Sequence, residues 1–319
     1  MFNKLCDRFS GLMMVWVVLA CGAGYVWPPV LVWMKPHLDW LFMLTMLGIG
    51  IVTPPHDFNE IVKRPRLVAL GMAAQFGIMP VCAFLVAKGL SLPKDLAVGL
   101  ILAGAAPDAM AAGVVSYAAH ADVAYSVALT GTSTLLAPVV TPALTYFFGK
   151  TYIEIAFTPM MISILKMVIA PLAVGMAIKR ATGKRLDGMV ALFPALSTVF
   201  IAGICGLVVA LNKDTLAEVT GLVFVAVFLL NLLGLALGYG AGMLFGFDVK
   251  RRRTLAIGVG MQNAGLGAVL AIKHISARAA VPNALFATWC IVSASLLAWY
   301  WSRRDRRTNA EDVPRSTVV

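Results

Sequence analysis

Long apolar segments alternate with short polar ones along nearly the whole chain. Segments with few or no charged residues cover 11–33, 38–53, 67–88, 96–119, 122–148, 158–178, 189–211, 219–246, 254–273 and 282–302. Polar segments that contain proline, aspartate and basic residues separate them. Runs of about 18 or more apolar residues are typical of membrane-spanning helices. The pattern therefore predicts an all-α polytopic membrane protein with ten transmembrane helices.

The charged residues indicate how these helices are oriented. Hydrophobic residues make up 60% of the chain and charged residues 13%, with a net charge of +11. The basic residues lie in short loops and at the C-terminus, so membrane topology explains them and we expect no nucleic-acid partner. Of the 26 lysines and arginines, 18 fall on the side of the N-terminus. This bias predicts that both termini are cytoplasmic.

Two predicted helices carry similar interruptions. The fourth contains GAAPDAMAAG at 104–113 and the ninth contains GVGMQNAGLG at 258–267. Ten spans can be two inverted sets of five, and we expect repeat one over 11–148 and repeat two over 158–302, within one transporter domain at 1–302. We expect the tail at 303–319 to be cytoplasmic and disordered. Interrupted helices at matching places of two halves indicate a transporter binding site.

Polar side chains at membrane depth are the candidate functional residues. Asp108 is the only acidic residue in the middle of a predicted span. A charge there costs roughly 2.5 kcal/mol or more, so a proton, a cation or a basic partner must neutralise it. Alternatively, Asp108 caps free N–H groups after Pro107. Gln262 and Asn263 are adjacent, so their amides point to different faces.

Other polar residues within the spans are weaker candidates. Gln75 and the pair Ser126 and Thr130 offer neutral oxygens for a hard cation, although each alone is more often an interhelical hydrogen bond than a ligand. Asn231 is a weaker candidate, for which we favour a packing role. Lys166 is the only basic residue deep in a span, and its long stem favours snorkelling to the nearer interface.

The sequence carries no enzyme motif. The four histidines lie in loops or at span ends, the five cysteines show no CxxC spacing, and HExxH, GxSxG and GxxxxGK[ST] are absent. The missing phosphate-binding loop argues against an ATP-driven pump within this chain. We therefore expect no enzymatic activity and no organic cofactor.

Several motifs resemble one known family. They are DFNEIVKRP followed by AAQFGIMP, then DVAYSVALTGTSTLLAPVVTP, KMVIAPL and GMQNAGLGAVLA. Over about residues 11–302 the chain resembles a bacterial member of the bile acid:sodium symporter family. The resemblance implies two inverted five-helix repeats, with the fourth and ninth helices unwound and crossing in a core domain that moves against a panel domain. It also implies sodium-coupled uptake of organic anions across the inner (cytoplasmic) membrane of a bacterium.

The resemblance also implies roles for particular residues. One sodium site corresponds to the Gln75 and Gln262 side chains with the Val259 and Met261 carbonyls, and part of a second to Ser126 and Thr130. At the crossing we predict substrate contacts from Asn263, Asp108, Met110, Gly113 and Gly258.

The chain departs from the family pattern at the crossing. Where the family typically reads EVGMQN, Gly258 replaces the glutamate, and PDAMAAG stands where PGGTASN is usual, which gives Ala112 and Gly113. Losing these ligands should weaken sodium binding. We hypothesise that the carboxylate has moved to Asp108, where it binds a displaced cation or carries a proton.

Together these features predict a secondary active transporter of a small organic anion that works by alternating access. Na⁺ or H⁺ is the coupling ion, and the partners are the anion and the lipid bilayer. Two alternatives remain: a membrane sensor or scaffold that does not transport, and an uncoupled facilitator.

Overall fold

The computed structural model describes residues 9, 12–52, 64–183 and 192–311, and every regular element within these ranges is a helix. In chain order the elements are α2 (Met13–Val26), α3 (Pro29–Val32), η1 (Lys35–His37), α4 (Leu38–Val52), α6 (Pro65–Gly89), α7 (Lys94–Ala105), α8 (Ala112–Ala118), α9 (Val123–Gly149), α10 (Phe157–Ile164), η3 (Leu165–Ile169), α11 (Ala170–Thr182), α12 (Leu192–Leu211), α13 (Leu216–Leu244), α14 (Val249–Gly260), α15 (Ala264–His274), η5 (Arg278–Ala280) and α16 (Val281–Glu311).

The helices confirm a polytopic membrane protein. Within the described residues, five helical segments are long and apolar enough to cross a bilayer: Pro65–Gly89, Val123–Gly149, Phe157–Thr182, Gly221–Leu244 and Arg278–Asp305. A bent pair adds a sixth candidate. The remaining apolar segments of the described chain form shorter helices, so ten spans stay a prediction.

The first predicted span is wrong in its second half. The helix expected over 11–33 ends at Val26, and the chain turns by 115° between Val15–Val26 and Pro29–Val52. Pro28 and Pro29 follow this end. Proline lacks a backbone N–H and disfavours helical geometry in the residue before it, which explains the turn.

The last helix is longer than its apolar sequence indicates. The predicted span ends at residue 302, whereas α16 continues to Glu311. The first part of the expected disordered tail is therefore helical, and residues 312–319 lie outside the described part of the chain.

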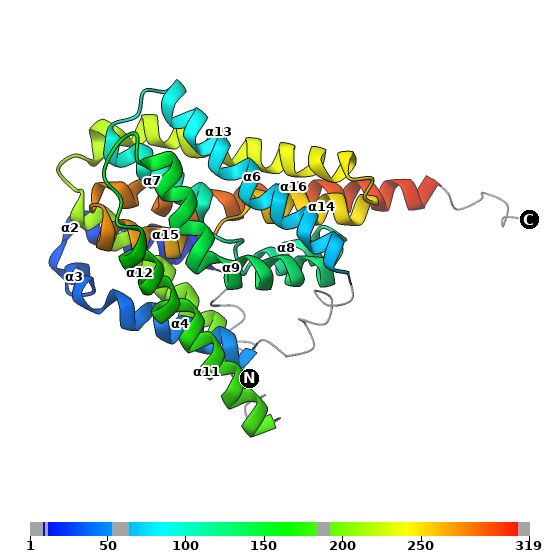
Figure 1. Cartoon of the computed structure of the whole chain (residues 1–319), viewed down its shortest axis with the longest axis horizontal. Coiled ribbons are helices and arrows are strands. Elements are labelled where there is room, and N and C mark those ends of the chain that lie inside the picture. Colours follow the sequence, from blue (N-terminus) through cyan, green and yellow to red (C-terminus); the bar gives the residue numbers. More distant parts are fainter. Residues whose placement is uncertain (1–8, 10–11, 53–63, 184–191, 312–319) are drawn as a thin grey trace, which may run out of the picture.

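The helices pack as two groups (Figure 1). The first group is α2, α4, α11 and α12, and the second is α6, α7, α8, α9, α13, α14, α15 and α16. Glycines let the paired helices of the first group approach closely. A Cβ on Gly50 would lie 2.3 Å from the Leu172 carbonyl oxygen, and one on Gly24 would lie 2.3 Å from that of Gly206. Such small-residue contacts are typical of helix packing in membranes.

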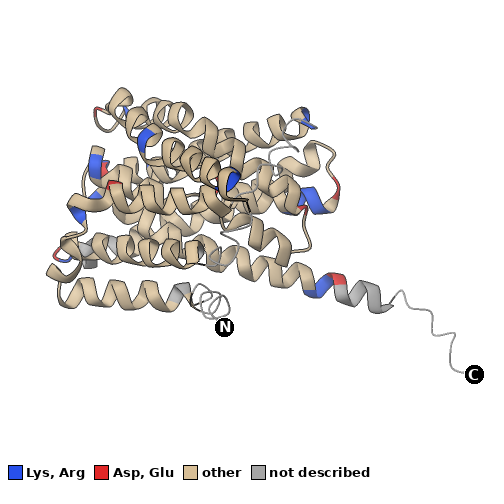
Figure 2. Cartoon of the chain, turned by 90° about the horizontal axis from the view of Figure 1, so that it is seen from below, with Lys and Arg blue, Asp and Glu red and all other residues tan. Residues whose placement is uncertain are grey.

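Charged residues lie mainly toward the ends of the helices (Figure 2). Lys166 is an exception, because it lies in the π-helical turn η3, which is inside the apolar segment Phe157–Thr182 and away from its ends. Its side chain is exposed, which agrees with snorkelling rather than with a buried ion pair.

Candidate functional site

The two interrupted helices meet at their interruptions. α7 and α8 are separated by 106–111, and α14 and α15 by 261–263. The Ala109 N–H donates to the Met261 carbonyl at 2.9 Å, and the Asn263 N–H donates to the Pro107 carbonyl at 2.8 Å. The N–H and C=O groups of unwound backbone at membrane depth need hydrogen-bond partners within the protein. Here each interruption provides such partners for the other.

Local sequence explains why these helices stop. Pro107 forces Ala106 into extended geometry, with φ −66° and ψ 155°, so α7 ends before it. On the other chain segment, Asn263 starts α15 because its side-chain oxygen accepts the Leu266 N–H at 3.1 Å. The predicted substrate contact Asn263 therefore also acts as a helix cap.

Asp108 lies at the centre of the crossing and is only 1% exposed. Its Oδ2 accepts a hydrogen bond from the Thr130 hydroxyl at 2.7 Å, and its backbone N–H donates to the Ser133 hydroxyl at 3.1 Å. Its Oδ1 is buried and has no hydrogen-bond partner among the described residues. Buried polar atoms normally have a hydrogen-bond partner, so this oxygen is a candidate to coordinate a cation or to bind a proton.

Gly258 faces the same carboxyl group. A Cβ built on Gly258 would lie 3.4 Å from Asp108 Oδ2 and 3.6 Å from Leu129 Cδ1. The Asp108 side chain thus occupies the space into which a longer side chain at position 258 would extend.

Buried amides form a second cluster beside the crossing. Gln75 Nε2 donates to Gln262 Oε1 at 2.9 Å, and Gln262 Nε2 donates to the Val259 carbonyl at 2.8 Å. The Met261 carbonyl already accepts the Ala109 N–H. Each carbonyl oxygen keeps a second lone pair, so this predicted sodium-ligand set can still coordinate an ion.

Asn231 takes part in packing, as one of the two sequence interpretations expected. Its Nδ2 donates to the Gly260 carbonyl at 2.8 Å, and the side chain is 1% exposed. This bond satisfies the last carbonyl of α14 where the helix is interrupted.

The predicted pair Ser126 and Thr130 divides between two partners. Thr130 binds Asp108, whereas Ser126 lies 3.2 Å from the Ser116 hydroxyl on α8. Sequence reasoning missed Ser116 and Ser133. Ser133 follows Thr130 by three residues, and this helical spacing on one face is the signal that could have identified it.

A groove of about 480 Å³ runs between α8 and α16. Its lining is mostly apolar with two serines and one arginine: Val114, Val115, Ala118, Ser295, Ala298, Trp299, Ser302 and Arg303. The Arg303 guanidinium lies 4.3 Å from the centroid of the Trp299 ring. The predicted contacts Met110 and Gly113 are partly buried near the start of α8. Sequence analysis did not single out the α16 residues.

No group of three His, Cys, Asp or Glu side chains in the described ranges could hold a metal ion. Cation binding at the crossing would therefore depend on Asp108 together with neutral hydroxyl, amide and carbonyl oxygens, which are hard ligands.

These features define a membrane transport protein, because paired interrupted helices with polar groups at membrane depth characterise secondary transporters. The Sodium Bile acid symporter family matches residues 40–219. The chain belongs to this family, which is a family of transporters and not of enzymes.

Similar proteins come from bacteria and plants. The chain is 38% identical over 296 residues to the uncharacterized sodium-dependent transporter YocS of Bacillus subtilis (strain 168), covering 93% of this chain and 92% of that protein. It is 33% identical over 310 residues to the probable sodium/metabolite cotransporter BASS1, chloroplastic, of Arabidopsis thaliana, covering 96% and 77%. The BASS2 protein of Oryza sativa subsp. japonica is 29% identical over 313 residues, covering 98% and 75%.

Proposed function

We propose that the protein is a secondary active transporter that moves a small organic anion by alternating access. Ten spans in two inverted sets of five place the interrupted helices at matching positions. The observation that carries the proposal is the buried crossing of these interruptions, where Asp108 Oδ1 has no described partner. The group of α2, α4, α11 and α12 acts as the panel, and the other group as the moving core.

The coupling ion binds at Asp108. The relatives named as sodium-dependent transporters and sodium/metabolite cotransporters support Na⁺ as this ion. Gly258 supplies no side-chain ligand, and the Asp108 carboxyl next to it provides the negative charge from the facing interruption. Thr130 orients this carboxyl through its 2.7 Å hydrogen bond. A proton bound by Asp108 is the alternative to Na⁺.

Neutral oxygens form a second ion position. Gln75 and Gln262 with the Val259 and Met261 carbonyls present hard ligands without a formal charge, and their hydrogen bonds fix their positions. Because no carboxylate belongs to this set, we expect it to bind a cation more weakly than the Asp108 site does.

The organic anion occupies the crossing and the groove between α8 and α16. At the crossing, we expect Asn263, Met110, Gly113 and Gly258 to contact the anion near Asp108. The apolar walls accept a hydrocarbon body, whereas Arg303 and the serines of the groove offer charge and hydrogen bonds to an acidic group. This combination favours carboxylates that have an apolar portion.

The test uses sodium alone as the first probe. Purified protein is unfolded thermally in sodium chloride and in potassium chloride at two pH values. We expect sodium to stabilise the wild type and to lose this effect in Asp108→Asn, since ligand binding to the folded state raises stability. The exposed acid Glu154, changed to Gln, provides the control with equal charge loss. Equal sodium effects in both variants would reject the Asp108 site.

Uptake into proteoliposomes then separates transport from the other functions. A panel of small carboxylates and taurocholate is assayed with a sodium gradient, with a pH gradient and with neither. Uptake driven by one gradient supports the proposal. Binding without uptake would instead identify a sensor or scaffold, and uptake insensitive to both gradients would identify a facilitator.

A further inference from the structure

A basic pocket lies at the end of the bundle that carries the turn between α13 and α14. It has a volume of about 650 Å³ and is lined by three arginines, one glycine and apolar residues: Arg64, Pro65, Arg66, Leu67, Leu70, Gly246, Phe247 and Arg251. No acidic residue lines it. We infer that this pocket binds the headgroup of an anionic membrane phospholipid, with its phosphate between the arginines.

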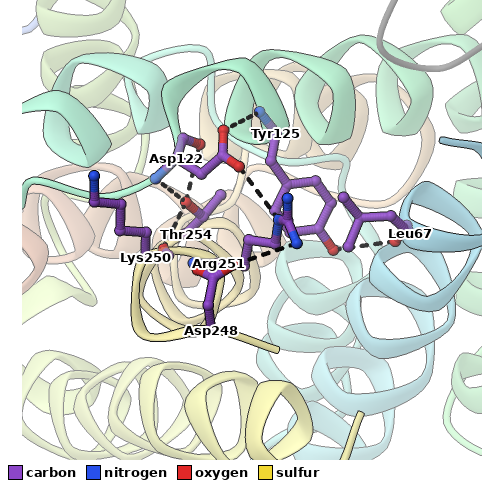
Figure 3. Close-up of polar contacts among 7 residues, drawn as sticks. All are labelled: Leu67, Asp122, Tyr125, Asp248, Lys250, Arg251 and Thr254. Carbon is purple, nitrogen blue, oxygen red and sulfur yellow. Dashed lines mark hydrogen bonds and ion pairs between the residues drawn. The ribbon is translucent and has the colours of Figure 1, made fainter. Parts of the chain in front are cut away.

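Arg251 is held in place before any ligand binds. Its Nε lies 3.4 Å from Asp122 Oδ2, and its Nη1 lies 3.2 Å from Asp248 Oδ2 (Figure 3). Asp122 is itself fixed, because its backbone N–H donates to the Thr254 hydroxyl at 2.9 Å and its side chain accepts the Tyr125 N–H at 3.0 Å. A guanidinium has five N–H donors, so two carboxylate contacts leave donors for a phosphate.

Leu67 and Phe247, two apolar residues that line the pocket, are also held in place by contacts with their neighbours. Tyr125 donates its hydroxyl to the Leu67 carbonyl at 3.2 Å (Figure 3). The centroids of the Tyr125 and Phe247 rings lie 6.0 Å apart, edge-on. Arg252 Nε donates to the Phe247 carbonyl at 2.5 Å. Gly246 makes the turn with φ +71°, a conformation that other residues rarely adopt. The start of α6 and the turn therefore form one rigid surface.

An exposed apolar strip leads away from the arginines along α6. Leu70, Ala73, Gly77, Val81 and Leu85 follow one another at intervals of three or four residues, so they share one face of the helix. A Cβ on Gly77 would meet nothing within 4 Å, so the strip is open there. An acyl chain can lie on this strip while its phosphate binds the arginines. Free phosphate would use the arginines alone, which is why we favour a lipid.

The position agrees with the membrane orientation expected from the basic residues. That orientation places this end in the cytoplasm, where anionic lipids attract basic segments next to transmembrane helices. The inference does not depend on transport, because lipid retention is measured without any substrate.

The experiment measures lipid retained by the full chain. Protein is reconstituted in vesicles of phosphatidylcholine with phosphatidylglycerol, extracted in neutral detergent and examined by native mass spectrometry. We expect wild type to retain phosphatidylglycerol and the double variant Arg64→Gln with Arg66→Gln to retain on the order of tenfold less. The matched control is Lys179→Gln with Arg180→Gln, which removes two charges at the end of α11 and should retain the lipid as wild type does.

Further arms test the headgroup and the chain separately. Ala73→Trp fills the strip while every arginine remains, and we expect it to reduce retention. Excess glycerol 3-phosphate should not displace the lipid, and displacement would overturn the role of the acyl chain. Equal retention by wild type and by both double variants would overturn the pocket. Thermal unfolding in neutral detergent checks that each variant folds. If the variant Arg64→Gln with Arg66→Gln does not fold, the single variant Arg66→Gln takes its place.

Discussion

At the scale of single residues, the crossing combines one buried carboxyl with a glycine that faces it. Asp108 Oδ2 lies 3.4 Å from the position of a Cβ on Gly258, and Leu129 bounds the same space. A glutamate at 258 and an aspartate at 108 would therefore place two carboxylates in one low-dielectric site. Like charges in such a site repel strongly, so one of the two residues must be small or neutral.

This geometry leads to a prediction for moving the carboxylate. Gly258→Glu alone brings a second acid beside Asp108, and we expect it to destabilise the protein in sodium chloride at neutral pH. Adding Asp108→Gly should recover stability and restore stabilisation by sodium. The glutamate at 258 then fills the space that the Asp108 side chain leaves, and the site again holds one carboxylate. Thermal unfolding in sodium against potassium measures both effects. A double variant that sodium no longer protects would contradict the exchange of positions.

Thr130 provides a second prediction at this scale. Thr130→Val removes the hydroxyl that donates to Asp108 Oδ2, beside an Oδ1 that has no partner among the described residues. We expect a loss of about 1–3 kcal/mol in unfolding free energy and a changed response to sodium. Thr132→Val is the matched control, because its hydroxyl donates to the Ala128 carbonyl of its own helix and not to Asp108. Equal behaviour of the two variants in thermal unfolding would reject this role for Thr130.

At the scale of helices, the interruptions follow from the sequence, whereas their partners do not. Pro107 and the glycines around Gln262 mark where α7 and α14 stop, so both interruptions were predictable. Asp108 was also predictable, because a lone acid in an apolar span has few explanations. Ser116 and Ser133 were not, since serine is common in membrane helices and its partner depends on three-dimensional packing.

Close helix pairs give a prediction about glycine. Gly50→Ala places a methyl group 2.3 Å from the Leu172 carbonyl oxygen, so α4 and α11 must separate. We expect it to lower the unfolding free energy by about 1–3 kcal/mol, as overpacking typically does. Gly22→Ala meets nothing within 4 Å and should be neutral or slightly stabilising. Thermal unfolding of both variants in detergent tests this, and equal melting temperatures would contradict the packing argument.

At the scale of the whole molecule, the ends of the bundle differ. At one end, polar contacts join α15 to the first group. Lys273 pairs with Asp39 of α4, and His274 Nε2 lies 2.9 Å from the Ser163 hydroxyl of α10, which continues through η3 into α11. At the other end, Arg253 binds both Asp305 oxygens, at 2.6 and 2.7 Å, and joins α14 to α16 within one group. The sequence predicted the charges at both ends, but the pairings depend on which helices become neighbours. Alternating access would require the contacts between the groups to break.

The Asp39–Lys273 pair allows this opening to be measured. In a background without the five native cysteines, Ser163→Cys reports access to a membrane-impermeant maleimide from the side that the charge bias predicts to be outer. Lys273→Glu makes the pair repulsive, and we expect labelling to accelerate about two- to fivefold, as fits the energy of an exposed ion pair. Adding Asp39→Lys restores attraction with reversed charges and should return the slow rate. If the single and double variants are labelled equally fast, the Asp39–Lys273 pair does not keep this end closed. If the double variant returns to the slow rate of the wild type, the attraction between these two side chains contributes to closure.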